Sequence, residues 1–237
     1  MIALHNLHIG YSKRILSCEE IHLERGKVYI LIGKNGAGKS TLLKTISKQL
    51  KPLSGQIFVD GCEIQSIPTR DFPKLVSFVP VQFPHMDYVR ASEYIAAGRA
   101  PYTDLLGRIT DADAEEIDQA IKLLEIEALR TRFTTQLSDG EKQLVSIAKS
   151  VAQQTPIILL DEPTAFLDYA NKKRVLYFLK EAAEKLNKCI LLSAHDINLC
   201  LEFTEDFLVV EANKKSLKVM VNPTKDALLA CAFGEEN

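Results

Sequence analysis

Long hydrophobic runs are missing from this sequence. No stretch of its 237 residues approaches the roughly 20 consecutive apolar residues that a membrane-spanning helix needs. The N-terminus, MIALHNLHIGYSKRIL, has no basic segment followed by an apolar core, so we do not expect a cleaved secretory signal. Any association with a membrane would therefore go through a partner protein.

Cysteine is scarce, and neither sign of charge dominates. The five cysteines are odd in number, widely spaced and free of any C-x-x-C pair, which favours reduced thiols in the cytosol over disulfides or a cysteine-held metal. The net charge is −2 and the pI about 6.2, so there is no overall basic field and we expect no nucleic acid partner. His5, His8 and His22 match no zinc-binding spacing, and we expect ordinary surface or core roles for them.

A glycine-rich loop, GKNGAGKST at residues 33–41, is the most informative segment. It directly follows the apolar run VYILI at 28–32 and precedes the helix-like TLLKTISKQL, so it fits the strand–loop–helix pattern that cradles a polyphosphate. Lys39 is placed to reach the β- and γ-phosphates and Ser40 to hold Mg²⁺. The alternative is a turn that merely caps a helix. The candidate nucleotide-binding residues here are Gly33, Asn35, Gly36, Ala37, Gly38, Lys39, Ser40 and Thr41.

Polar side chains follow three later apolar runs, where strands of an open α/β sheet would end. Gln82 follows the run at 75–79, Asp161 and Glu162 follow IILL at 157–160, and His195 follows the run at 189–194. Ligands bind at this edge of such sheets. Asp161 is suited to Mg²⁺, Glu162 to accepting a proton from an attacking water, and His195 to the γ-phosphate. For Gln82, a magnesium or water contact competes with a loop-capping amide, and for the acids a solvated loop is the alternative.

Two further segments point to a nucleotide. Tyr11, upstream of the loop, can stack on an adenine or pack as an ordinary tyrosine, and its position alone favours neither role. Ser138 precedes a helix and has Glu141 three residues on, so a capping box explains part of the segment LSDGE. The capping box leaves Gly140 unexplained, and a helix N-terminus with a free hydroxyl and exposed N–H groups is also a phosphate site.

The pattern of elements predicts an α/β fold with an inserted helical part. Strand-like runs fill the beginning and end of the chain, and helical periodicity replaces them from Phe83 to Gln153. We therefore expect a nucleotide-binding core at 1–82 and 154–237, with a helical subdomain at 83–153. The aromatic and basic residues between Phe83 and Thr103 suggest a protein-docking surface, although core packing explains some of the aromatics equally well.

Taken in order, GKNGAGKST, Gln82, LSDGE, IILLDEP, AFLD and SAHD resemble the nucleotide-binding subunit of ATP-binding-cassette (ABC) transporters. This resemblance implies a single domain with a P-loop NTPase (RecA-like) core, a mainly parallel sheet, an N-terminal antiparallel β subdomain and the inserted helical subdomain. It implies ATP and Mg²⁺ as ligands, with Tyr11 on the adenine and the phosphate loop around the phosphates. It also implies Gln82 and Asp161 at the magnesium, Glu162 as catalytic base and His195 as the γ-phosphate switch.

The resemblance also implies that two copies of the chain sandwich two ATP molecules head to tail. Ser138 and Gly140 of one copy would close the site on the other, and Asp168 would lie in the loop that crosses to the partner. The usual signature is LSGGQ, and here Asp139 and Glu141 replace a glycine and the glutamine. Asp139 would bring a negative charge near a bound γ-phosphate unless it points away.

The segment YIAAGRAPYTDLLGR at 94–108 is similar to a region of the ATPases that drive iron-siderophore, haem and cobalamin importers. We therefore expect an importer ATPase for a ferric chelate or related metal complex. It would dock on transmembrane permease subunits through residues 83–106, at the cytoplasmic face of the inner or plasma membrane. The alternative is a cytosolic cassette ATPase without a pore, such as the scaffold ATPase of iron–sulphur cluster assembly.

Overall fold

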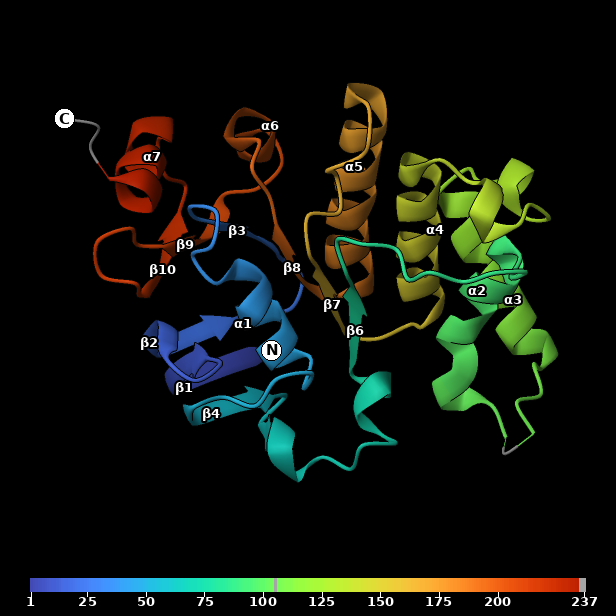
Figure 1. Cartoon of the computed structure of the whole chain (residues 1–237), viewed down its shortest axis with the longest axis horizontal. Coiled ribbons are helices and arrows are strands. Elements are labelled where there is room, and N and C mark those ends of the chain that lie inside the picture. Colours follow the sequence, from blue (N-terminus) through green and yellow to red (C-terminus); the bar gives the residue numbers. More distant parts are fainter. Residues whose placement is uncertain (105, 235–237) are drawn as a thin grey trace.

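A computed structural model describes residues 1–104 and 106–234, and it shows two sheets with helices packed around them (Figure 1). Leu105, which falls within the expected permease-contact range 83–106, lies outside the described residues, as does the acidic C-terminal end at 235–237. In the part of the chain that the structure describes, no helix is both long enough and apolar enough to span a bilayer.

The smaller sheet is antiparallel and is built by the N-terminal residues. Its strand order is β2-β1-β4-β5, with β1 (Ile2–Gly10), β2 (Arg14–Leu23), β4 (Ser54–Val59) and β5 (Cys62–Glu63). Asp60 and Gly61 connect β4 to β5 with positive φ of 48° and 82°, which a tight two-residue hairpin turn requires. This sheet is the antiparallel β subdomain expected from the sequence.

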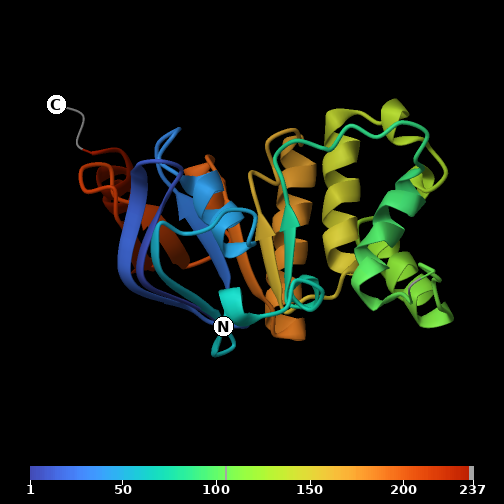
Figure 2. The same cartoon turned by 60° about the horizontal axis from the view of Figure 1, so that its bottom comes forward.

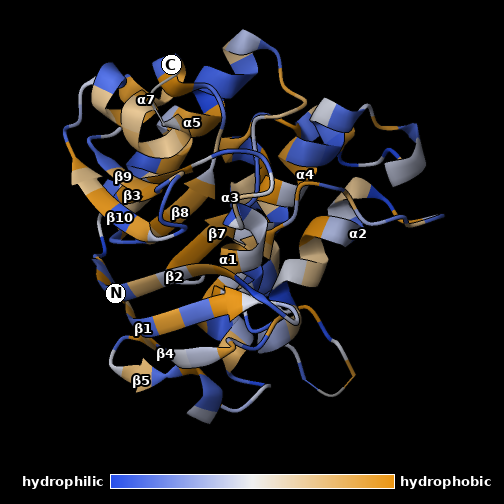
Figure 3. Cartoon of the chain, turned by 60° about the vertical axis from the view of Figure 1, so that its left-hand side comes forward, coloured by the Kyte–Doolittle hydropathy of each residue, from blue (hydrophilic) through white to orange (hydrophobic). Residues whose placement is uncertain are grey.

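The larger sheet has six strands in the order β10-β9-β3-β8-β7-β6, and only β10 runs antiparallel to its neighbour. The strands are β3 (Val28–Ile32), β6 (Val76–Val79), β7 (Ile157–Leu160), β8 (Cys189–Ser193), β9 (Asp206–Val210) and β10 (Leu217–Val221). All residues of β3, β7 and β8 are buried, as expected for parallel strands covered on both faces. The hydropathy colouring of Figure 3 shows them as apolar.

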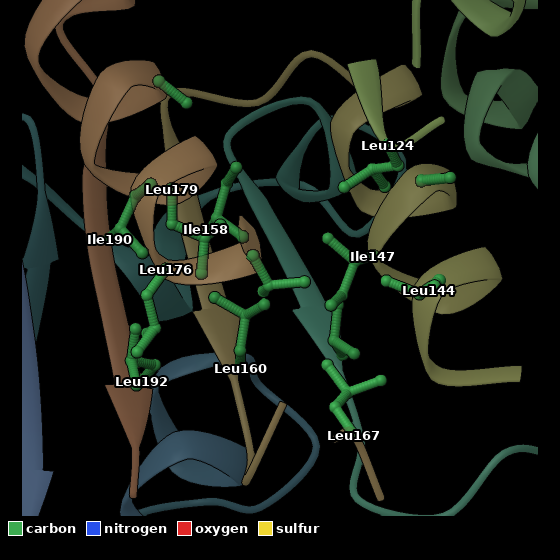
Figure 4. Packing of buried hydrophobic residues seen from close by; sticks show 14 of the residues in the cluster. Leu124, Leu144, Ile147, Ile158, Leu160, Leu167, Leu176, Leu179, Ile190 and Leu192 are labelled. Atoms are coloured by element: carbon green, nitrogen blue, oxygen red, sulfur yellow. The ribbon is translucent and has the colours of Figure 1, made fainter. Parts of the chain in front are cut away.

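Helices cover both faces of this sheet. They are α1 (Lys39–Ile46), α5 (Tyr169–Leu186), α6 (Ile197–Leu201) and α7 (Lys225–Phe233). In Figure 4, Leu176 and Leu179 of α5 pack against Ile190 and Leu192 of β8, and all four are at most 4% exposed. The predicted α/β fold with a mainly parallel sheet is confirmed. The carboxyl ends of its parallel strands all lie at the same edge of the sheet.

Between β6 and β7 the regular elements of the described chain are helical (Figure 2). They are the α-helices α2 (Ala91–Ala96), α3 (Asp111–Leu123) and α4 (Asp139–Ala152), with 3₁₀ turns at 97–102, 127–129 and 134–136. Other short 3₁₀ turns lie at 64–66 and 72–74. Helices α2, α3 and α4 share one core with the large sheet through residues such as Ile121 and Ile147.

A buried ion pair holds the helical part together. Arg99 donates from Nε to Oδ1 of Asp113 over 2.8 Å and from Nη1 to the carbonyl of Ala152 over 2.9 Å. Arg99 is 9% exposed and Tyr94 is 4% exposed. These two members of the aromatic and basic segment are therefore core residues, and the docking surface suggested for the segment can include only its exposed members.

Candidate active site

Three neighbouring parallel strands bring most of the predicted site residues to one edge of the sheet. The phosphate loop follows β3, His195 follows β8, and Asp161 and Glu162 follow β7, which lies beside β8. A cleft of about 540 Å³ opens at this edge. Its lining residues are Asn35, Gly36, Gly38, Lys39, Ser40, Thr41, Glu162 and His195.

The phosphate loop presents a buried cation that forms no ion pair with a described carboxylate. Lys39 is 6% exposed, and its Nζ donates to the carbonyls of Gly33 over 2.8 Å and Lys34 over 3.2 Å. Among the described residues no carboxylate lies within 4.0 Å of Nζ. Burial lowers the pKa of Lys39, while the charges of Glu162 and Asp161 act in the opposite direction. An anion in the cleft would supply the missing charge, so the loop suits a phosphate.

Glycine is required at the centre of this loop. Gly36 and Gly38 have φ of 76° and 101°, which side chains rarely tolerate. A Cβ at Gly38 would approach Cγ2 of Ile15 to 2.8 Å, whereas one at Gly36 would meet nothing within 4 Å. The start of β2 therefore packs under the loop, and the space above Gly36 is open for a ligand.

Asp161 and Glu162 are held by a residue that sequence reasoning missed. Ser193, at the end of β8, donates from Oγ to Oδ1 of Asp161 over 2.7 Å and accepts the backbone N–H of Glu162 over 2.9 Å. Asp161 is 2% exposed and Ser193 is fully buried. Glu162 has a left-handed backbone, with φ of 48°, which is strained for a residue other than glycine. The only sequence signal for this role was a hydroxyl inside an otherwise apolar strand.

Glu162 and His195 contact each other directly. The distance from Nε2 of His195 to Oε1 of Glu162 is 2.6 Å. The side chain of His195 is 44% exposed and that of Glu162 is 27% exposed, so both can be reached from the cleft. The predicted base and the predicted phosphate-contacting histidine therefore occupy one place on the sheet edge.

Gln82 lies elsewhere. It follows β6, the edge strand, and lines a second cleft of about 470 Å³ instead of the one at the phosphate loop. The second cleft lies between residues 81–86 and the beginning of α4, and the other residues that line it are Thr134, Thr135, Asp139, Lys142, Gln143 and Phe166. The structure thus separates Gln82 from the residues with which the sequence grouped it.

The signature turn is both a helix cap and an exposed surface. Ser138 accepts the N–H of Glu141 at Oγ and donates its own N–H to the Glu141 carboxylate, which confirms the capping box. Ser138 nevertheless stays exposed. Asp139 forms an ion pair of 3.2 Å with Lys142, one turn along the helix. Gly140 packs against the loop after β7, because a Cβ there would lie 3.0 Å from the carbonyl oxygen of Phe166.

Asp168 and Tyr11 both lie in loops, Asp168 just before α5 and Tyr11 between β1 and β2. Asp168 caps α5 by accepting the N–H of Asn171 over 2.8 Å, and it is exposed. Tyr11 is 63% exposed in the turn between β1 and β2, so it is not a core residue. Among the described residues, neither side chain lines the cleft at the phosphate loop.

Comparison with known proteins decides the family, because a family model described as "ABC transporter" matches residues 18–165. The chain belongs to the ABC transporter family. An uncharacterized ABC transporter ATP-binding protein of Methanocaldococcus jannaschii is 36% identical over 216 residues, which span 90% of this chain and 74% of that protein. A petrobactin import ATP-binding protein of Bacillus anthracis is 34% identical over 215 residues, or 90% and 79% of the two chains.

Among solved structures, an inward-facing ABC transporter described as of the "metal-chelate type" superposes with a TM-score of 0.82. It is 27% identical in sequence, and the match covers 97% of this chain and 88% of that one. This chain is thus an ATP-hydrolysing ABC subunit, and the predicted family, P-loop NTPase fold and ATPase activity are confirmed.

Proposed function

We propose that this chain powers the import of an iron-siderophore or related metal complex by hydrolysing ATP on a membrane permease. The observation that carries the ATPase part is the single cleft shared by the phosphate loop, Glu162 and His195. The import part is supported by the petrobactin import relative and the metal-chelate type structure. The segment at 94–108 supports the same substrate class.

ATP binding begins at the phosphate loop. The buried ammonium of Lys39 lies beside backbone carbonyls and would exchange those contacts for the β- and γ-phosphates. The ring of Tyr11, exposed in the neighbouring turn, is available to stack on the adenine. Ser40 and Asp161 offer a hydroxyl and a carboxylate, the hard oxygen donors that Mg²⁺ prefers. When bound there, Mg²⁺ would neutralise phosphate charge during transfer.

Hydrolysis needs a base and a group that contacts the γ-phosphate. Glu162 is placed to accept a proton from the attacking water, and Ser193 fixes its backbone. His195 lies against Glu162 and is placed to donate a hydrogen bond to the γ-phosphate. In the structure Glu162 and His195 bind each other. A water bound to Glu162 and a γ-phosphate bound to His195 would therefore compete with this contact.

One chain supplies only part of each active site. Ser138, Gly140 and Asp168 do not line the phosphate cleft of their own chain, and Ser138 and Asp168 are exposed. We therefore infer a head-to-tail dimer in which these residues close the site of the partner. The ion pair between Asp139 and Lys142 offsets the negative charge that the altered signature introduces.

The second cleft is the proposed permease-docking surface. Its walls come from residues 81–86 and from the segment at 134–143, so it extends beyond the range 83–106 inferred from the sequence. Gln82 lines this cleft and follows the sheet edge that holds the ATP site. A permease element seated there would place the chain at the cytoplasmic face of the membrane.

Uptake in a deletion strain tests this proposal. The strain is complemented with the wild-type gene or with Glu162→Gln, and the accumulation of radioiron from petrobactin, a ferric hydroxamate and haem is measured. We expect the wild type alone to restore at least one of these uptakes. Normal uptake of all three in the deletion strain would refute the substrate class. Purification of the chain with soluble assembly proteins instead of a permease would favour the scaffold alternative.

A further inference from the structure

The outer face of the antiparallel sheet brings together three side chains that the sequence keeps apart. His5 on β1 pairs directly with Glu20 on β2, and His22 lies two residues further along β2 on the same face. Their inward-facing neighbours Leu4 and Ile21 are at most 5% exposed, so the alternation of the strands turns the three polar side chains outward. Cross-strand pairing, which no linear motif reports, creates this cluster.

The cluster has the geometry of a metal site. Its potential ligand atoms all lie within 4.8 Å of one another. Oε1 of Glu20 is 2.9 Å from Nε2 of His22 and 3.9 Å from Nδ1 of His5, and the second distance is too long for a hydrogen bond. Zinc bound to nitrogen and oxygen at about 2.1 Å in a tetrahedron separates its ligands by about 3.4 Å. The two observed distances lie on either side of that value.

The surroundings orient the rings and leave space above them. The rings of Phe58 and His22 meet the ring of His5 edge-on, with centroids 5.2 and 5.7 Å away. Ala3, paired with both His22 and Phe58, is too small to fill the space between them. A hollow of about 450 Å³ opens there, lined by His5 and His22 among others, and it has room for a water as a further ligand.

From this geometry we propose that His5, Glu20 and His22 form a surface site for a divalent first-row transition metal such as Zn²⁺. Two imidazoles and one carboxylate favour Zn²⁺, Cu²⁺ and Ni²⁺ over Mg²⁺ and Ca²⁺, which prefer oxygen ligands alone. The site joins β1 to β2 at a place outside both clefts described above. It is therefore independent of the ATP-binding residues and of the proposed transport function.

Zinc titration of the tag-free, full-length, reduced protein tests the site. Calorimetry is run without nucleotide and with excess Mg²⁺, which occupies any site that has oxygen ligands alone. We expect one Zn²⁺ per chain in the wild type. His5→Gln and His22→Gln should each weaken binding at least about tenfold, since changes even to groups behind the ligands alter metal affinity about 10- to 100-fold. Co²⁺ should give the visible absorption of a tetrahedral site in the wild type and lose it in both variants.

Two control variants separate this site from other ligands. His8→Gln removes a histidine on the same strand whose Nδ1 is 2.8 Å from the Ser54 hydroxyl, and Cys62→Ser removes an exposed thiol of the same sheet. Both should bind zinc as the wild type does. No binding to the wild type, or equal binding to the wild type and His22→Gln, would overturn the proposal. Since both histidine side chains are at least 38% exposed, the variants should fold, and Glu20→Gln offers an isosteric third test.

Discussion

Replacing Ser193 by alanine tests whether this buried hydroxyl positions Asp161 and Glu162, the proposed magnesium ligand and the proposed base. The change removes one hydrogen bond to a carboxylate, at Asp161, and one from the backbone of Glu162. Hydrogen bonds to charged groups contribute about 1.5–3 kcal/mol and neutral ones about 1 kcal/mol, so the variant should lose about 2.5–4 kcal/mol of stability. We expect it to remain folded at a reduced melting temperature.

The catalytic effect should exceed what lost stability explains. Without Ser193, Asp161 can rotate and the strained backbone of Glu162 can relax, while the phosphate loop keeps all its contacts. Loss of a group that orients a metal-binding residue lowers activity about 10- to 100-fold. We therefore expect kcat for ATP to fall by that factor with KM for ATP nearly unchanged, and the magnesium concentration for half-maximal activity to rise.

Ser77→Ala is the matched control. Ser77 is also a buried serine of the large sheet, but its Oγ bonds to the hydroxyls of Ser150 and Thr155, away from the acids. It should lose stability and keep its turnover. Steady-state ATPase assays well below both melting temperatures compare the variants. Equal kcat values for Ser193→Ala and Ser77→Ala would refute the positioning role.

Three further predictions concern the base, the cation and a buried acid. Glu162→Gln should abolish turnover and form a dimer with ATP and Mg²⁺, and a monomer in size-exclusion chromatography with light scattering would contradict the shared site. Lys39→Ala should lose ATP binding in calorimetry, and unchanged affinity would exclude the phosphate role. Hydrogen bonds from Thr110, and then from Arg99, lower the pKa of Asp113 from 3.8 to about 2. This depression contributes about 2 kcal/mol of stability that is present above about pH 4 and lost as the pH falls to about 2. In acid titrations of urea unfolding, Asp113→Asn should be less stable at neutral pH but have a flatter profile, and parallel profiles would contradict this.

The sequence predicted the parts of the fold that depend on local pattern. The apolar runs at 28–32, 157–160 and 189–193 are buried strands, as their composition indicated. Ser138 caps α4 as its capping box indicated. These features follow from periodicity and from short-range hydrogen bonding, which neighbouring residues determine.

Features that depend on pairing between distant segments could not be predicted. His5 and Glu20 become neighbours only through the β1–β2 register, and no spacing rule for metal ligands contains them. Ser193 meets Asp161 because β8 lies beside β7, although the residues are 32 positions apart. Arg99 carries a full charge in a segment that suggested a surface, and its burial depends on Asp113 and the carbonyl of Ala152.

The position of Gln82 shows why strand ends alone do not define the active site. In the order β3-β8-β7-β6, the phosphate loop follows β3 and His195 follows the adjacent strand β8. Glu162 follows β7, the second strand from β3, and Gln82 follows β6, the third. With about 4.8 Å between strands, β6 lies about 14 Å from β3. Gln82 lines the docking cleft and not the phosphate cleft, and the segment after β6 that carries it forms one wall of the docking cleft. Because Gln82 lines the proposed docking cleft and follows a strand of the sheet that carries the phosphate loop, we expect it to link ATP binding to the permease.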